Sequence, residues 1–117
     1  MEEMDDILAE VREELYQKGY IDQKLLGNGS KKLGSFKFGF FFFGLKDGKL
    51  AIIPYADYKN VLYDEIKYYG KESFKSIKFS DMNSILHIKF ADGGDYKYTI
   101  LRVGKSDFIK IISIFDP

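Results

Sequence analysis

The sequence contains no cysteine, no tryptophan, one histidine and two prolines among its 117 residues. Without cysteine there is no disulfide framework, no zinc–thiolate site and no thiol nucleophile. The single histidine, His87, cannot form a two-histidine metal site, and no carboxylates stand near it at the spacing of a catalytic or metal-binding motif. We therefore interpret His87 as an exposed strand residue, and we expect no catalytic residues, no metal site and no cofactor.

An excess of charge of one sign is also lacking, because 18 basic and 18 acidic residues cancel to a net charge of zero. Such a chain has no global field that attracts nucleic acid, so we expect no nucleic-acid partner. The longest apolar run, residues 40–43, is far below the ~18 residues of a membrane-spanning helix. The first residues are acidic, unlike a secretory signal, and these features together predict a cytoplasmic protein.

The balanced total conceals a separation of charge along the chain. Residues 1–19 hold seven acidic and two basic residues, a net charge of −5, whereas residues 20–60 hold three acidic and seven basic residues, a net charge of +4. Aromatic residues are abundant, with eleven phenylalanines and nine tyrosines. Aromatic residues favour strands, so this composition predicts a mainly β protein. The length of the chain predicts one domain.

The first 21 residues predict an amphipathic helix. Apolar residues recur there at helical spacing among acidic residues: Ile7, Leu8, Val11 and Leu15. Gly19 stands where such a helix would end. Residues 22–34 contain a Gly-Asn-Gly-Ser-Lys-Lys segment, and we interpret them as a flexible linker.

Residues 35–117 predict short consecutive strands followed by one helix. The strand-like runs are residues 36–45, 50–55, 65–69, 76–79, 86–90 and 96–100. Asp47-Gly48, between the first two runs, favours a type I′ hairpin turn, whose two central residues need positive φ. The helix is indicated by apolar residues at helical spacing, Phe108, Ile111, Ile112 and Phe115. Ser106 is placed to cap it.

The predicted fold class is mainly β with two helices (α+β). We expect an antiparallel, six- to seven-stranded bent barrel or split barrel capped by the C-terminal helix, with the N-terminal amphipathic helix in addition.

Three segments resemble those of bacterial pleckstrin-homology-like (PH/GRAM-like) domains. FGLKDGKLAIIP, residues 43–54, is similar to the hairpin that opens such domains, DEI, residues 64–66, to their next strand, and residues 86–100 to their last hairpin. The resemblance implies a seven-stranded, bent antiparallel barrel plugged at one end by a single C-terminal helix. It also implies a non-catalytic scaffold that binds protein or, less often in bacteria, lipid.

Two function hypotheses follow. The first is a non-catalytic binding or scaffold module that associates with a protein partner or with itself. The alternative is a peripheral binder of anionic lipid headgroups, which would use a basic patch near the barrel mouth, each lysine contributing about 1 kcal/mol near an anionic surface. The candidate residues of that patch are Lys24, Lys31, Lys32 and Lys37. In an alternative interpretation, the same lysines pair with the acidic N-terminal helix.

The phenylalanine run admits three interpretations. Alternation along a strand would place Phe36, Phe38, Phe40 and Phe42 on one face, and Phe41 and Phe43 on the other. We favour a strand covered on both faces, by core on one and by the N-terminal helix or a second subunit on the other. The second interpretation is an RNA-binding strand, but the basic and glycine positions that should precede it are missing. The third, a membrane-inserting loop, fits a strand interior poorly.

Tyrosines follow this strand and extend a candidate protein interface. The candidate interface residues are Phe41, Phe43, Tyr55, Tyr58 and Tyr68. Tyrosine is enriched at interfaces because its ring buries area while its hydroxyl stays hydrogen-bonded. Tyrosine is also common at half-exposed positions of sheets, so both interpretations of these tyrosines stay open.

Overall fold

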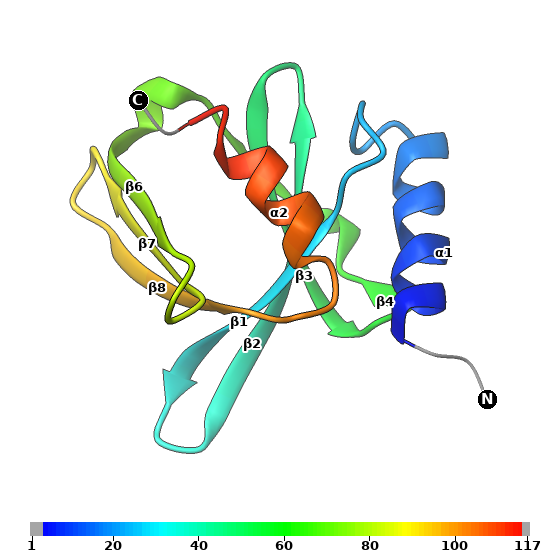
Figure 1. Ribbon diagram of the computed structural model, residues 1–117, viewed down its shortest axis with the longest axis horizontal. Helices are drawn as coiled ribbons and strands as arrows, with labels where there is room; N and C mark the ends of the chain where they lie inside the picture. The colour runs from blue at the N-terminus through cyan, green and yellow to red at the C-terminus, as the bar shows by residue number, and fades with distance from the viewer. Residues whose placement is uncertain (1–3, 116–117) are drawn as a thin grey trace.

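The structure is a computed structural model and describes residues 4–115 (Figure 1). Its elements in chain order are α1 (Met4–Gln17), β1 (Gly27–Gly34), β2 (Lys37–Lys46), β3 (Lys49–Asp57), β4 (Asn60–Val61), the 3-10 helix η1 (Tyr63–Glu65), β5 (Lys67–Tyr69), the 3-10 helix η2 (Lys71–Ser73), β6 (Phe74–Ser80), β7 (Ile85–Phe90), β8 (Asp95–Ile100) and α2 (Lys105–Ile112). The predicted fold class, mainly β with one helix near each end, is confirmed.

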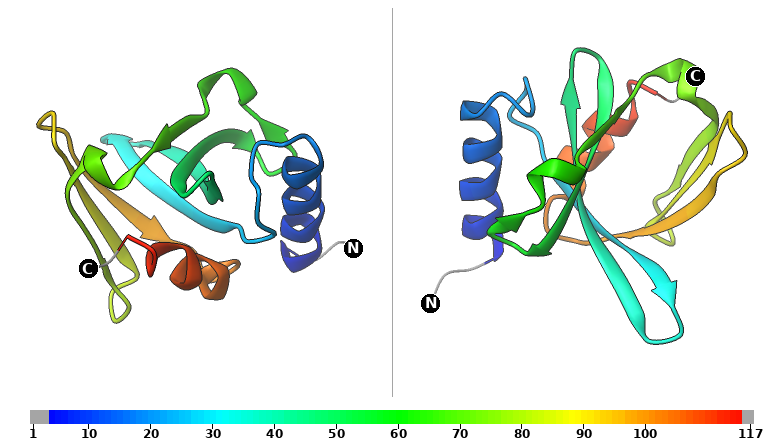
Figure 2. Two further views of the ribbon diagram at one scale, coloured as in Figure 1. Left: turned by 90° about the horizontal axis from the view of Figure 1, so that it is seen from above. Right: turned by 180° about the vertical axis from the view of Figure 1, so that it is seen from behind.

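The strands form one antiparallel sheet in the order β4-β3-β2-β1-β8-β7-β6, with β5 paired to β3 beside β4. β1 joins the two halves, because it pairs with β2 along its length and with β8 at Gly29 and Ser30. The sheet curves strongly, as Figure 2 shows, but within residues 4–115 its outer strands do not pair, so it is not a closed barrel. Residues 4–115 form eight strands rather than six or seven, because Gly27–Gly34 and the two-residue β4 are strands that the sequence pattern did not indicate.

The predicted linker is wrong from residue 27 onward, because Gly27–Gly34 forms β1. This strand has little apolar character of its own, and its glycines instead allow close packing by other elements. A Cβ atom on Gly27 would lie 2.8 Å from the Cβ of Phe108 in α2, and one on Gly29 would lie 2.9 Å from the carbonyl oxygen of Thr99 in β8. The first three residues of β1 are therefore a buried part of the sheet rather than a solvated connection, whereas its last three are exposed.

The two faces of the sheet carry separate hydrophobic clusters. On the concave face, Phe43 packs in the cluster that contains Phe108 and Ile111 of α2. On the other face, Phe42 packs in the cluster that contains Leu15 of α1. Figure 2 shows the two helices on different sides of the sheet. The expectation that β2 is covered on both faces, with the N-terminal helix on one of them, is confirmed for these residues.

α2 begins differently from the prediction. Its N-cap is Gly104, with φ +88° and no side-chain cap, so Ser106 lies inside the helix and does not cap it. The carboxylate of Asp107, in the first turn, accepts a hydrogen bond from the backbone N–H of Leu26 at 3.2 Å and pairs with the guanidinium of Arg12 at 3.0 Å. One side chain of α2 thus connects α1 and the segment that leads into β1.

Candidate aromatic cavity and hairpin arm

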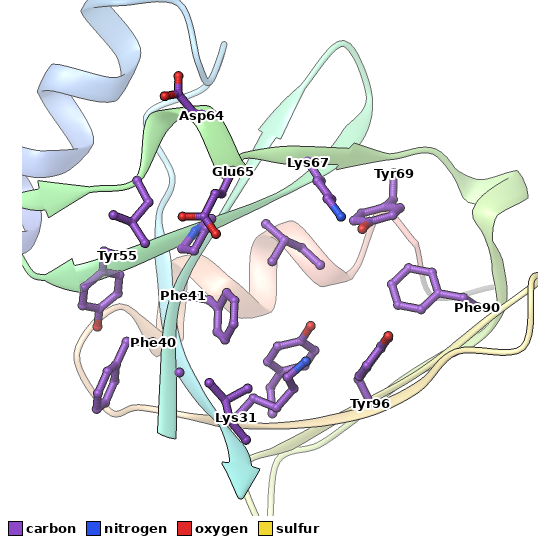
Figure 3. Close-up of a pocket in the computed structure, with 16 residues that line it drawn as sticks. Lys31, Phe40, Phe41, Tyr55, Asp64, Glu65, Lys67, Tyr69, Phe90 and Tyr96 are labelled. Carbon is purple, nitrogen blue, oxygen red and sulfur yellow. The ribbon is translucent and has the colours of Figure 1, made fainter. Parts of the chain in front are cut away.

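An open cavity of about 560 Å³ lies between the two halves of the curved sheet (Figure 3). Its walls come from β1, β2, β3, β5, β7 and β8 and from the segment around η1. Seven aromatic residues line it: Phe40, Phe41, Tyr55, Tyr69, Phe90, Tyr96 and Tyr98. Because Ile52, Phe90 and Tyr98 also belong to the core that α2 covers, this aromatic cavity continues that core toward solvent.

Lys31 places a cation against the rings of the cavity. Its Nζ lies 4.1 Å from the ring centroid of Tyr96, 5.7 Å from that of Tyr98 and 5.8 Å from that of Phe41. Contacts of this length are cation–π interactions. Burial lowers the pKa of Lys31 below its ordinary value, because removal from water disfavours the charged form. Among the described residues, no carboxylate forms an ion pair with this ammonium.

Three tyrosines add hydroxyl groups to the same cavity. Burial raises the pKa of Tyr98 well above its ordinary value, and the neighbouring Tyr69 and Tyr96 raise it further. Burial also raises the pKa of Tyr69, with smaller contributions from Tyr96 and Asp92. All three tyrosines line the cavity, and a tyrosine hydroxyl is a hydrogen-bond donor.

The opposite rim of the cavity carries charges of both signs. Asp64 and Glu65 come from η1, and Lys67 comes from β5. Figure 3 shows Glu65 and Lys67 directed toward the cavity and Asp64 directed away from it. Among the residues of β1, β2, β3, β7 and β8 that line the cavity, Lys31 is the one charged side chain.

The four lysines of the predicted basic patch are not gathered in one place. Lys24 pairs with Glu13 of α1 at 3.2 Å and lies 5.0 Å from the ring of Tyr16. Lys31 lies in the aromatic cavity, whereas Lys32 and Lys37 are exposed on the β1–β2 hairpin. The expected pairing with the acidic helix therefore holds for Lys24. Lys31, Lys32 and Lys37 all lie on the β1–β2 hairpin, and they do not form one basic patch together with Lys24.

Two of the predicted interface residues are buried. Phe43 is fully covered within the core under α2, and Tyr55 is 5% exposed. The hydroxyl of Tyr55 donates to Oδ1 of Asn28 at 2.5 Å, and its ring stacks on Phe42 at 4.0 Å. Phe43 and Tyr55 are not exposed to a partner in this conformation, because Phe43 packs in the cluster beneath α2 and Tyr55 packs in the cluster that contains Phe42 and residues of α1. Phe41 is half-buried and lines the aromatic cavity.

The other two predicted interface tyrosines lie at the surface. Tyr58 is half-buried with its ring 5.3 Å from that of Tyr55. Tyr68 is exposed, and its hydroxyl donates to the backbone oxygen of Tyr20 at 2.8 Å. Tyr68 therefore connects β5 to the chain that follows α1.

The β1–β2 hairpin projects from the body of the protein as an arm (Figure 1). We define the hairpin arm as residues 31–40. β8 pairs with β1 only at Gly29 and Ser30, and β3 pairs with β2 from Phe40 onward, so the outer part of the arm has two unpaired edges. Its exposed apolar side chains are Leu33, Phe36, Phe38 and Phe40, with Phe36 98% exposed. The alternation of phenylalanines along the sequence indicated an aromatic face on this strand. It did not show that α1 covers this face only at Phe42 and leaves the outer phenylalanines exposed.

His87 faces an acidic partner across β7 and β8. Its Nε2 lies 2.6 Å from Oδ1 of Asp95 at the protein surface, and this hydrogen bond lowers the pKa of Asp95. Residues 4–115 contain no group of three or more His, Cys, Asp or Glu side chains placed to hold a metal ion. In the same part of the chain, no helix combines the length and the apolar character needed to cross a membrane.

Comparisons with protein-family models, with curated proteins and with solved structures gave no match to this chain. The resemblance to pleckstrin-homology-like domains therefore stays a prediction.

Proposed function

We propose that this protein is a non-catalytic, cytoplasmic binding module of the pleckstrin-homology-like type that associates with a second copy of itself through the hairpin arm. The exposed aromatic face of the arm carries this proposal. Phe36 and Phe38, 98% and 55% exposed, stand on a projecting hairpin whose edges are unpaired. Exposed apolar side chains in one contiguous patch are typical of interaction surfaces, and unpaired strand edges offer backbone hydrogen bonds to a partner.

Charge favours α1 of the second copy as the surface that receives the arm. Residues Met4–Gln17 contain five acidic residues and one basic residue, which gives −5 + 1 = −4. The arm presents Lys32 and Lys37 at its surface and contains no acidic residue. A reciprocal contact, in which each arm meets the α1 helix of the other copy, closes into a two-fold dimer. Complementary charge of this kind contributes to orientation and is weakened by salt.

Sedimentation velocity tests this proposal. We expect the protein to sediment as a dimer at micromolar concentration in low salt and to shift toward monomer in high salt. Phe36→Ser combined with Phe38→Ser should give a folded monomer, since substitutions at exposed positions usually change stability by less than about 0.5 kcal/mol. Met82→Ser is the matched control, because Met82 is 94% exposed on the β6–β7 turn, away from the arm, and should leave the dimer intact. A wild-type protein that is monomeric throughout this range contradicts the proposal.

A second candidate function, binding to an anionic membrane surface, is favoured by one observation. Residues 23–46 contain five lysines and no acidic residue, and the arm adds exposed phenylalanines to this basic segment. Co-sedimentation with anionic and with neutral vesicles, at low and high salt, tests it. Salt-sensitive binding to anionic vesicles that is lost in Lys32→Glu with Lys37→Glu supports a membrane partner. An absence of binding to anionic vesicles in low salt rules this candidate out.

A further inference from the structure

Lys31 is half-buried, and its ammonium has no carboxylate partner among residues 4–115. A charge that leaves water is costly unless it is paired, so structural lysines usually keep the ammonium in solvent. Lys31 instead turns its ammonium onto the rings of Tyr96 and Tyr98. The contacts with the rings offset part of the free-energy cost of removing the ammonium from water, and an anion bound in the cavity would offset the rest.

The surroundings of Lys31 specify the kind of anion. Tyr69, Tyr96 and Tyr98 contribute hydroxyl donors, and Phe41 and Phe90 contribute ring surface. A phosphate group has three or more oxygens to satisfy and is often bound by an arginine fork, and no arginine lines this cavity. A carboxylate has two oxygens, which one ammonium and tyrosine hydroxyls can satisfy.

We propose that the aromatic cavity binds a small aromatic carboxylate. The carboxylate lies between Nζ of Lys31 and the tyrosine hydroxyls, and the ring of the ligand packs against Phe41 and Phe90. A volume of about 560 Å³ with mostly apolar walls and a few convergent polar groups falls within the range of small-molecule sites. This ligand site goes beyond the proposed self-association: Leu33 and Phe40 of the arm line the cavity, but Phe36 and Phe38, which carry the proposed dimer contact, do not.

Isothermal titration calorimetry with two probes of the same shape tests the proposal. The probes are 2-naphthoate and 2-naphthamide, which differ in charge at the group that would meet Lys31. We expect the wild-type protein to bind the naphthoate about tenfold to a hundredfold more tightly than the amide, as expected for a charge-assisted hydrogen bond. No binding of naphthoate, or equal affinity for the two probes, overturns the proposal.

Adjacent lysines of β1 supply a matched pair of variants. Lys31→Met keeps the length of the side chain and removes the charge, so it should abolish the preference for naphthoate while the circular dichroism and thermal unfolding stay those of a folded protein. Lys32→Met changes the next residue, which does not line the cavity, and should keep the wild-type preference for naphthoate. A preference that persists in Lys31→Met, or is lost in Lys32→Met, contradicts the assigned site.

A second readout follows the lysine itself. The pKa of Lys31, lowered by burial in the free protein, should rise when naphthoate binds, because a nearby carboxylate favours the ammonium. NMR titration of the lysine side chains measures this change, and an unchanged Lys31 in the presence of saturating naphthoate contradicts the contact. Phe36→Ser with Phe38→Ser should remove the dimer and leave naphthoate affinity unchanged, since neither residue lines the cavity. Failure of the ligand site and failure of the dimer are therefore distinguishable.

Discussion

Replacement of Gly27 by alanine should destabilise the protein, because β1 passes directly beneath α2. The new Cβ would lie 2.8 Å from Cβ and 2.9 Å from Cδ1 of Phe108, whereas carbon atoms normally approach to about 3.5–4.0 Å. Phe108 is fully buried, and its ring contacts Phe43 and Phe79 with centroids 5.4 Å and 5.1 Å away. It therefore has no free space into which to move.

Overpacking of this kind costs about 1–3 kcal/mol. For a domain of this size, each kcal/mol corresponds to roughly 4 °C in Tm, so we expect Gly27→Ala to lower Tm by about 4–12 °C. Thermal unfolding followed by circular dichroism gives this value directly. If residues 22–34 were a flexible linker, the same substitution would instead change stability by less than about 0.5 kcal/mol, as substitutions at exposed positions usually do.

Gly34→Ala is the control on the same strand. A Cβ atom at Gly34 meets nothing within 4 Å, so its Tm should stay close to that of the wild type. Equal Tm values for Gly27→Ala and Gly34→Ala would refute the packing of β1 against α2.

Two further predictions concern the ends of the fold and its buried hydroxyls. Asp107→Ala should lower the free energy of unfolding in urea by about 2–4 kcal/mol, because the buried N–H of Leu26 loses a charged acceptor. Arg12→Ala removes only a partly exposed ion pair and should lower it by about 0.5–1 kcal/mol. Equal losses in the two variants would contradict the role given to the hydrogen bond from Leu26. Burial raises the pKa of Tyr55 and Tyr98, so folding favours their neutral forms, and stability is complete below the ordinary tyrosine value of about 10 and falls as pH rises above it. Tyrosinate absorbance should show two of the nine tyrosines ionising together with loss of tertiary structure, and nine tyrosines that ionise in the intact fold would contradict their burial.

Short sequence patterns predicted the turns, strands and helices that depend mainly on residues close together in the sequence. Asp47 and Gly48 have φ values of +53° and +74°, as the hairpin turn between β2 and β3 requires, and this turn is one that dipeptide chemistry specifies. The alternation of Phe42 and Phe43 between two clusters also followed from the period of a strand. The apolar spacing of Phe108 and its neighbours likewise identified the buried face of α2.

Contacts between distant segments were not predictable from the sequence. β1 has glycines and lysines where a strand pattern needs apolar alternation, and its burial comes from Phe108 and Ile100, more than 70 positions further along the chain. The cavity depends on the same long-range pairing, since Lys31 meets Tyr96 only because β1 lies beside β8. Lysine is usually exposed, and nothing in the neighbouring sequence distinguishes Lys31 from Lys32.

The most direct test of the account is a crystal structure of the protein grown with 2-naphthoate. We expect electron density for the ligand in the aromatic cavity, with its carboxylate within hydrogen-bond distance of Nζ of Lys31 and its rings beside Phe41 and Phe90. A cavity without ligand under saturating naphthoate, or a carboxylate bound away from Lys31, would contradict the proposed site.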